Sequence, residues 1–321
     1  MTPPSSPLPD LDAMMDVTAR FEAAQRDDPA LETAQLDEVL RHVPGKRAIL
    51  LGSFQGDPAV FRMALAPDDP MPAREWAEMT RIWPDMQDGP YRIAAPLHFA
   101  PEHALLVIEA VSGTPLMQYI WHFDPDQRHG LMTGPAKWLR QYTLGSERSS
   151  EARASTWLIR AEEAAVTQPH GKLRRREARV LRHLRPLSKA MGAQPWRYAI
   201  SHGDFHPNNL LIDGERLTGI DNGGSASMPI YKDMARFLMH MGRRGLIPSG
   251  RARFGVDLEG IEAFSDAFDL TQHEREVVLP FFLGCEALLR VENPGMKRGR
   301  IKRAAQMYDK LNADLGGLSA L

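Results

Sequence analysis

The sequence predicts an α+β protein in which a strand-rich part is followed by a longer, mainly helical part. Strand-like apolar runs are concentrated between residues 46 and 112, whereas helical spacing of apolar residues dominates from residue 116 onward. The composition is typical of a globular protein, since 43% of the residues are hydrophobic and 25% are charged. With 321 residues, the chain can hold two domains or one two-lobed unit.

The charge and the cysteine content exclude several classes of protein. A net charge of −2 gives no general attraction to nucleic acid or to an anionic membrane. Cys285 is the only cysteine, which excludes an intramolecular disulfide and fits a reducing cytoplasm. The N-terminus lacks the basic and apolar regions of a signal peptide, and no apolar run approaches the ~18 residues of a membrane span. We therefore expect a soluble, cytoplasmic protein with neither nucleic-acid nor membrane partners.

Residues 1–45 form an N-terminal extension ahead of the predicted sheet. Residues 1–10 are rich in Pro and Ser and are expected to be disordered. Near-helical spacing of apolar residues predicts a helix over 11–26. Asp28 and Pro29 have the features of an N-cap and a first-turn proline, so they predict a second helix over 30–42.

Four strand-like runs follow, with a helix among them. The runs over 46–53 and 59–65 predict a hairpin, and a helix begins near Met71. Two more apolar runs, over 91–95 and 104–110, predict further strands, and the second is apolar enough to be central in the sheet.

The helical part contains a basic amphipathic segment over residues 172–185. This segment can be interpreted as a surface for anions or nucleic acid, or as an ordinary helix with arginines in water and three apolar residues buried. We favour the ordinary helix, because the chain as a whole is slightly acidic and no nucleic-acid motif accompanies the segment. The residues expected to be buried are Leu173, Val180 and Leu184.

The most informative stretch runs from Ser201 to Asp221. Its apolar runs 209–212 and 216–220 are separated by the turn signal Asp213-Gly214, which predicts a second hairpin. Because a hairpin brings its two ends together, we expect Asn209 and Asp221 to face each other, with Asp204 on the loop beside them. Two carboxylates and an amide oxygen suit a hard cation such as Mg²⁺, and a nucleoside triphosphate is the natural partner of that ion.

The residues His202-Gly-Asp204-Phe-His-Pro-Asn-Asn209, followed by Ile220-Asp-Asn-Gly223, resemble the aminoglycoside phosphotransferase/choline kinase family. The resemblance covers roughly residues 46–240 with recognisable landmarks. It implies a bilobal, protein-kinase-like fold. The small nucleotide-binding lobe, an antiparallel sheet plus a helix, would span residues 46–112. The larger, mainly helical lobe, with the catalytic loop and the acceptor pocket, would span residues 113–321.

The resemblance also implies a reaction, the ATP- and Mg²⁺-dependent transfer of the γ-phosphate to a hydroxyl group of a small molecule. The acceptor classes it suggests are aminoglycosides, sugars and amino alcohols. Asp204 would orient the acceptor hydroxyl and accept its proton, while Asn209 and Asp221 would hold the metal. His202 and His206 lie beside these residues and are expected to brace the loop through hydrogen bonds.

The chain departs from the family pattern in the small lobe. Arg62 stands where the family has a phosphate-binding lysine, and no lysine occurs between Lys46 and Lys137. Arg62 can replace the lysine, Lys46 can reach in from the neighbouring strand, or nucleotide binding can be weakened or lost. We favour the first alternative, because the role needs only a fixed cation near the phosphates. The resemblance assigns Glu75 as the partner of this cation, with Glu78 as a rival.

Two further small-lobe features would contribute through their backbone. Residues 109–111 resemble the interlobe hinge, which makes Glu109 and Val111 candidate backbone contacts to the nucleotide base. Gly52 and Gly56 can let backbone amides approach phosphates, and a plain hairpin turn explains them equally well.

Two features of the helical lobe remain open to two interpretations each. Asp233 can buttress the catalytic loop, as the resemblance implies, or cap the helix that begins near Pro229. The carboxylates of Glu262, Asp266 and Asp269 share one face of a predicted helix. They can form an acidic wall for a cationic acceptor or a merely solvated face, and we favour the solvated face.

A second hypothesis for the whole chain is a pseudokinase, a nucleotide-binding or regulatory module with weak or no transfer activity. The intact set of Asp204, Asn209 and Asp221 favours an active kinase, whereas Arg62 and the N-terminal helices favour the pseudokinase. The sequence carries no signal for the acceptor, for ATP against GTP, or for an oligomeric state.

Overall fold

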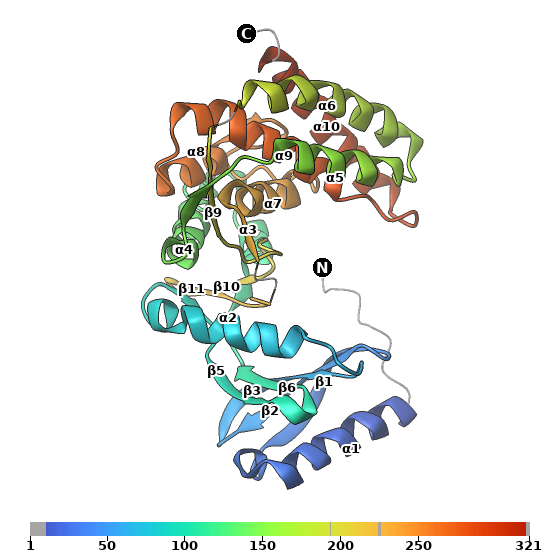
Figure 1. Ribbon diagram of the computed structural model, residues 1–321, viewed down its shortest axis with the longest axis vertical. Helices are drawn as coiled ribbons and strands as arrows, with labels where there is room; N and C mark the ends of the chain where they lie inside the picture. Colours follow the sequence, from blue (N-terminus) through green and yellow to red (C-terminus); the bar gives the residue numbers. More distant parts are fainter. Residues whose placement is uncertain (1–10, 193, 224–225, 319–321) are drawn as a thin grey trace. The chain divides into compact units, whose positions relative to one another are not determined.

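The chain divides into two compact units. A computed structural model describes residues 11–192, 194–223 and 226–318 (Figure 1). The first unit comprises residues 1–113 and 218–225, and the second comprises residues 114–217 and 226–321. The disorder expected for residues 1–10 lies outside the described residues.

An antiparallel sheet of five strands forms the centre of the first unit. The strand order is β1-β2-β3-β6-β5. The hairpin and the two later strand regions expected from the sequence are present, but β5 was not predicted. The bounds are β1 (Gln35–Val43), β2 (Arg47–Phe54), β3 (Asp57–Ala64), β5 (Pro96–Ala100) and β6 (Leu105–Glu109), with the short β4 (Tyr91–Ile93) outside this sheet.

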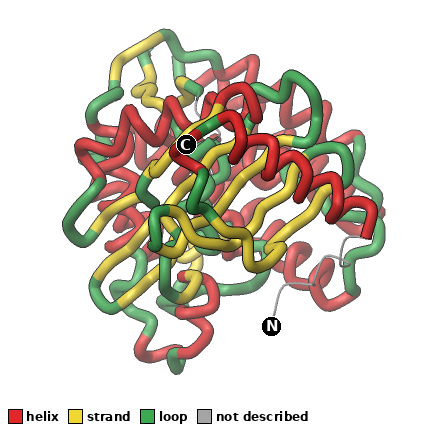
Figure 2. Tube along the Cα trace, turned by 90° about the horizontal axis from the view of Figure 1, so that it is seen from below, coloured by secondary structure: helices red, strands yellow, loops and turns green. Residues whose placement is uncertain are grey.

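Two helices cover opposite faces of this sheet. Because successive strand residues point to opposite faces, Phe61 and Arg62 of β3 must face different neighbours. Phe61 packs edge-on against Phe21 of α1 (Leu11–Asp27), with ring centroids 5.5 Å apart, whereas Arg62 contacts Glu75 of α2 (Met71–Met86). Figure 1 shows α1 and α2 on the two sides of the strands, and Figure 2 shows α1 in front of them.

The helix predicted over residues 30–42 is wrong, because this segment is mainly strand β1. Asp28 caps only a single 3-10 turn, η1 (Pro29–Leu31), and the chain then pairs with β2. The pairing shifts register between Leu36 and Glu38 and again between Val39 and Arg41. Such bulges break the two-residue alternation of a strand, so apolar residues recur at a spacing that resembles a helix.

The two glycines considered for phosphate binding both have local structural reasons. A Cβ on Gly52 would lie 1.9 Å from the Gln35 carbonyl oxygen, so only glycine lets β1 approach β2 this closely. Gln55 and Gly56 both have positive φ, at 55° and 92°, and form the two-residue turn between β2 and β3. Gly56 therefore serves the turn, which is the plainer of the two interpretations.

Asp28 is expected to stabilise the start of this sheet. Its Oδ1 accepts the Ala30 N–H at 3.0 Å, and its Oδ2 lies 2.6 Å from His98 Nε2. The hydrogen bond with His98 lowers the pKa of Asp28, so its contribution to stability is present above the unfolded pKa and is lost as the pH falls through the folded value. We expect Asp28→Ala to lower the free energy of unfolding by about 1 kcal/mol at pH 7 in urea titrations.

Two comparisons test this expectation. Asp28→Asn keeps a capping oxygen and should lose less stability than the alanine variant. Asp37→Ala makes the same change at an exposed position of β1 and should have little effect. Equal effects of Asp28→Ala and Asp37→Ala would contradict the role of the cap.

The second unit is mainly helical, as the sequence predicts. Its aromatic core is centred on the fully buried Phe205, which stacks on Trp138 and Phe237 with centroids 5.5 and 5.0 Å apart. The helices are α3 (Leu116–His122), α4 (Thr133–Leu144), α5 (Ala154–Val166), α6 (Gly171–Ala190), α7 (Ile230–Gly242), α8 (Leu258–Ala267), the π-helix η4 (Glu274–Val278), α9 (Leu279–Leu289) and α10 (Arg298–Leu318). None of the described helices is long and apolar enough to span a membrane.

Short strands complete the second unit. The strand β9 was not predicted, and the hairpin expected after Asn209 is present as β10 and β11. Its turn is one residue later than expected, at Gly214 and Glu215, with Gly214 at φ 58°. The strands are β7 (Thr114–Pro115), β8 (Arg148–Ser150), β9 (Trp196–Ile200), β10 (Leu210–Asp213), β11 (Arg216–Gly219, which continues into the first unit), β12 (Ser227–Pro229), β13 (Ala252–Arg253) and β14 (Val256–Asp257).

The basic segment on α6 and the acidic segment on α8 both have the simpler of the two structures proposed for them, a helix whose charged side chains face solvent. In α6 the three predicted apolar residues are buried, while Arg176 and Arg185 pair with acidic residues of neighbouring helices. On α8 the side chains of Glu262 and Asp266 are 52% and 70% exposed, and each pairs with an arginine. Glu262 and Asp266 thus form a solvated face, whereas Asp269, which was predicted to share it, lies beyond the end of α8 with φ 47°.

Candidate functional site

The loop after β9 is held in place by the first turns of α7. The carboxylate of Asp233 accepts the N–H groups of His202, at 2.8 Å, and of Gly203, at 3.5 Å. Lys232 Nζ donates to the Gly203 carbonyl oxygen at 2.6 Å. The N-cap of α7 is Pro229, so Asp233 buttresses the loop and does not cap the helix.

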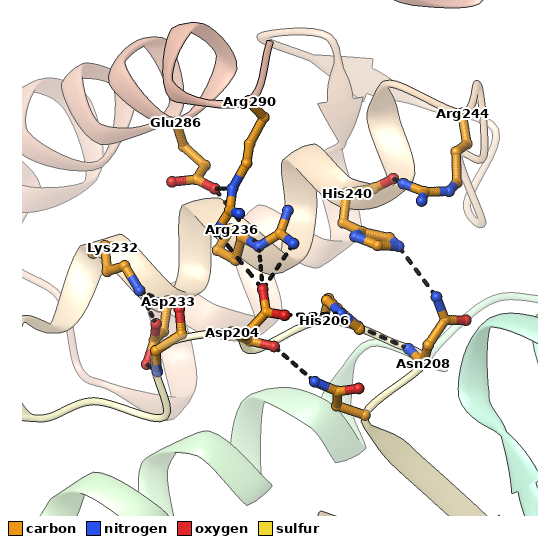
Figure 3. Close-up of polar contacts among 12 residues, drawn as sticks. Asp204, His206, Asn208, Lys232, Asp233, Arg236, His240, Arg244, Glu286 and Arg290 are labelled. Carbon is orange, nitrogen blue, oxygen red and sulfur yellow. Dashed lines mark hydrogen bonds and ion pairs between the residues drawn. The ribbon is translucent and has the colours of Figure 1, made fainter. Parts of the chain in front are cut away.

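The Asp204 carboxylate is fixed by cationic side chains around it (Figure 3). Its Oδ1 accepts hydrogen bonds from Arg236, at 3.1 Å from Nε and 2.8 Å from Nη2, and lies 3.7 Å from Arg290. Its Oδ2 lies 3.5 Å from His206 Nε2. The hydrogen bond with His206 and the charge of Arg236 hold the pKa of Asp204 well below its usual range, although burial opposes them. The side chain is 49% exposed, so an ionised carboxylate is presented to solvent in a fixed orientation.

Two neighbours of Asp204 complete the loop. Asn209 Nδ2 donates to the Asp204 carbonyl oxygen at 3.1 Å, which leaves the amide oxygen as the group that can bind a metal. The His206 ring stacks on His240, with centroids 4.4 Å apart, and its Nδ1 accepts the Asn208 N–H at 3.3 Å. His206 therefore braces the loop through hydrogen bonding, as predicted.

His202 supports the loop from inside the aromatic core. It is fully buried, and its ring lies 5.8 Å from Trp138 and 5.9 Å from Tyr142. Its position is fixed by packing as well as by the backbone bond to Asp233, so it has no surface toward a substrate.

In the first unit, Arg62 forms ion pairs with two carboxylates. It donates to Glu75, and its Nη1 lies 3.0 Å from Asp221 Oδ1. The rival residue Glu78 pairs with Arg81, so the sequence-based choice of Glu75 as the ion-pair partner agrees with the structure. Burial alone would lower the pKa of Arg62, but Glu75 and Asp221 raise it, and the guanidinium stays charged. Arg62 is thus a fixed cation on α2's side of the sheet.

The Lys46 alternative receives no support from the structure. The residue is exposed, and among the described residues its side chain makes no hydrogen bond or ion pair. Arg62 is the cation that pairs with Glu75, and its replacement of the expected lysine stays a prediction.

At the end of β6, Glu109 uses its side chain within the first unit. Its carboxylate accepts hydrogen bonds from Arg92 and from the Ala95 N–H, the latter at 2.9 Å. The N–H of Glu109 donates to the Ala95 carbonyl oxygen, whereas the N–H of Val111 has no partner among the described residues. The backbone contacts of Glu109 and Val111 to a nucleotide base stay a prediction.

The residues present suit a magnesium–nucleotide complex better than a protein-only metal centre. In the described part of the chain, no group of three or more His, Cys, Asp or Glu residues could hold a metal ion. Mg²⁺ in phosphate-transfer enzymes is commonly held by one or two carboxylates together with substrate phosphates. Asp221, whose side chain is 50% exposed, and Asn209 supply oxygen ligands of that kind. They belong to different units, and the shared site predicted for them stays a prediction.

A pocket beside Asp204 was not predicted from the sequence. It encloses about 190 Å³ between α7 and residues 290–300 of the second unit. A signal for it exists, because positions 236, 240 and 243 recur at helical spacing along α7 and its C-cap. The lining residues are Arg236, His240, Arg243, Arg244, Arg290, Val291, Glu292, Met296 and Arg300.

The fold and the loop geometry define a phosphotransferase of the small-molecule kinase class. A model of the phosphotransferase enzyme family matches residues 102–268, more than half of the chain. The chain belongs to this family. A search of curated protein sequences gives no match.

Solved structures with the same fold share little sequence with the chain. A putative aminoglycoside phosphotransferase from Ralstonia eutropha JMP134 is 14% identical, with coverage of 94% of this chain and 98% of that chain, and a TM-score of 0.60. A choline/ethanolamine kinase family protein from Mesorhizobium loti is 16% identical, with coverage of 96% and 100% and a TM-score of 0.58. Amicoumacin kinase in complex with AMP-PNP, Ca²⁺ and Ami is 14% identical, with coverage of 93% and 96% and a TM-score of 0.56. These similarities confirm the predicted protein-kinase-like α+β fold.

Proposed function

We propose that the chain transfers the γ-phosphate of ATP, with Mg²⁺, to a hydroxyl group of a small molecule. The observation that carries this proposal is the half-exposed Asp204 carboxylate, held ionised and oriented by His206 and Arg236. Phosphoryl transfer depends mainly on positioning and electrostatics, and an aspartate in this place orients the acceptor hydroxyl and takes its proton. Asp204 is accordingly the proposed catalytic residue.

The nucleotide is proposed to bind through residues of the first unit. Arg62, fixed by Glu75, would supply the positive charge that the family's lysine gives to the phosphates. Backbone groups of Glu109 and Val111 would contact the base, and Asn209 and Asp221 would hold the metal. Mg²⁺ and ATP, when bound, supply the phosphoryl group and neutralise its oxygens. The solved relatives that contain AMP-PNP or ADP are consistent with nucleotide use.

A second candidate is a nucleotide-binding module with weak or no transfer activity. It is favoured by one observation, the contact of 3.0 Å between Arg62 and Asp221. An arginine that pairs with a proposed metal ligand competes with the metal for that carboxylate. The location we propose is the cytoplasm, where ATP is available and where Cys285 would stay reduced.

A phosphate-transfer screen tests the choice between the two candidates. The acceptors are aminoglycosides, choline-like alcohols, sugars and hydroxy amino acids, with ATP and Mg²⁺ and with EDTA as the control. An active kinase should be stabilised thermally by ATP with Mg²⁺, hydrolyse ATP slowly, and transfer phosphate to at least one acceptor. Stabilisation without turnover would support the binding module. If millimolar nucleotide gives neither stabilisation nor turnover, both candidates are overturned.

A further inference from the structure

The pocket beside Asp204 is strongly basic. Five arginines line it, and a single carboxylate, Glu292, does so in the described part of the chain. Three of the arginines come from α7 and the segment directly after it. The five residues, called the arginine cluster below, are Arg236, Arg243, Arg244, Arg290 and Arg300.

Carboxylates neutralise only part of this cluster. Glu286 lies 2.9 Å from Arg290 and 3.7 Å from Arg236, Asp204 contacts the same two arginines, and Glu292 pairs with Arg243. Thus, among the described residues, three carboxylates pair with three of the five guanidinium groups, and the other two have no carboxylate partner. In that part of the chain, Arg244 donates only to the His240 carbonyl oxygen, at 2.7 Å, and Arg300 has no side-chain partner.

The surrounding groups leave this excess of positive charge in place. Burial is the main cause that lowers the pKa of Arg244 to about 10, and the charges of Arg300, Arg236 and Arg243 add to it, so the guanidinium is still charged at neutral pH. Burial raises the pKa of Glu177, the next carboxyl group behind Glu292, and favours its neutral form. Burial likewise lowers the pKa of His240, so its ring is neutral.

We infer that the arginine cluster binds an anionic group of the acceptor, so that the acceptor is a small alcohol carrying a phosphate or carboxylate group. This inference rests on the proposed function and names its acceptor class. Guanidinium groups bind both anions through paired hydrogen bonds. Arg236 and Arg290 line the pocket and also contact Asp204. An anion held by the cluster would therefore place the rest of the molecule next to the catalytic carboxylate.

The same features disfavour the polycationic acceptors suggested by the family resemblance. A protonated amine in this pocket would face uncompensated arginines, and like charges in a partly desolvated site repel strongly. The volume of about 190 Å³ is also below the ~300–1,000 Å³ typical of sites for drug-sized ligands. A small anionic head group fits this volume.

A matched acceptor series tests the inference. Glycerol, 3-amino-1,2-propanediol, glycerate and glycerol 3-phosphate share a three-carbon skeleton and differ in charge, and glucose, glucosamine, gluconate and glucose 6-phosphate repeat the comparison on a larger skeleton. We expect transfer to the anionic members with kcat/KM at least about tenfold above the neutral and cationic ones. The phosphate and carboxylate members distinguish the two sources of the anion.

Arg300→Gln is the variant of choice, because this side chain is partly exposed and its loss leaves no described partner unpaired. It should raise KM for the anionic acceptor about tenfold and leave KM for ATP unchanged. Lys302→Gln removes the same charge from an exposed position of α10 outside the pocket, and should change neither KM. Arg244→Gln provides a second pocket variant, and circular dichroism checks that each variant is folded.

Failure of this inference can be distinguished from failure of the proposed function. Transfer to neutral or cationic acceptors alone, unchanged by Arg300→Gln, would overturn the inference and keep the kinase. If no acceptor is phosphorylated, calorimetric titration of glycerol 3-phosphate without nucleotide still tests whether the arginine cluster binds an anion. Binding that Arg300→Gln weakens about tenfold and Lys302→Gln does not would support the anion site, and absence of binding at millimolar concentration would refute it.

Discussion

Asp204→Ala is expected to lower kcat for phosphate transfer by about a thousandfold or more, while the Kd for ATP stays within a few-fold of the wild-type value. A positioned general base contributes about 10²–10⁴ in rate, and the loss of orientation of the acceptor hydroxyl adds to this effect. The nucleotide contacts proposed for Arg62, Glu109 and Val111 are unaffected. Steady-state kinetics with the best acceptor and calorimetry with ATP and Mg²⁺ measure the two quantities.

The control for this variant is Asp266→Ala, which removes a carboxylate of the same unit that is 70% exposed and pairs with Arg275. Its kcat should be close to that of the wild type. Asp204→Asn keeps the size of the side chain and should be nearly as inactive as the alanine variant, since an amide does not accept the proton. A near-normal rate for either Asp204 variant would remove this residue from the mechanism.

The loop that carries Asp204 could be predicted from the sequence because part of its structure is specified locally. Phe205 and Leu210 are apolar and become buried, while Asn209 bonds to the backbone of Asp204 five residues earlier. The pair of Arg62 and Glu75 could also be anticipated, because the family resemblance assigns Glu75 as the partner of the cation on the strand. Local sequence and fold class together fix such features.

The features that the sequence did not predict depend on tertiary contacts. The segment with Leu36 and Val39 is a strand because bulges against β2 change its spacing, and those bulges are set by pairing with a neighbour and by Gly52. The arginine cluster joins residues of α7 and the two positions after it to residues that follow α9, from 46 (290 − 244) to 64 (300 − 236) positions away. Only the spacing of residues 236, 240 and 243 along α7 and its C-cap pointed to it.

The charge of the proposed acceptor site also depends on tertiary contacts and could not be predicted from the sequence. The sequence draws attention to the carboxylates of α8, which the structure leaves exposed and paired with arginines. The charge that lies against Asp204 is instead positive, and it comes from Arg236 and Arg290, which the motif analysis did not single out.

Arg62→Ala is expected to lower the free energy of unfolding by about 3 kcal/mol at pH 7, because it leaves a buried carboxylate without its cation. Glu75 is 7% exposed, and Arg62 is its ion-pair partner in the described structure. Asp221 is half-exposed and can be solvated when the arginine is removed, so it contributes little to the loss. Urea denaturation followed by circular dichroism measures the effect. The control is Arg74→Ala, an exposed neighbour on α2 without a described side-chain partner, which should have little effect.

The pH dependence of this loss identifies its cause. Burial raises the pKa of Glu75 and Arg62 opposes that shift, so removing Arg62 raises the folded-state pKa further. Glu75 of the folded variant then keeps its proton above ~4.3, the pKa at which the unfolded chain releases it. The variant therefore loses stability as the pH rises from this value to the folded-state pKa of Glu75. The deficit relative to the wild type should therefore be smaller at pH 5 than at pH 8. The double variant Arg62→Ala/Glu75→Gln should recover part of the stability at pH 8, because it removes the unpaired charge. If the free energy of unfolding falls equally at both pH values and the double variant recovers none of it, then an unpaired charge on Glu75 is not the cause of the loss.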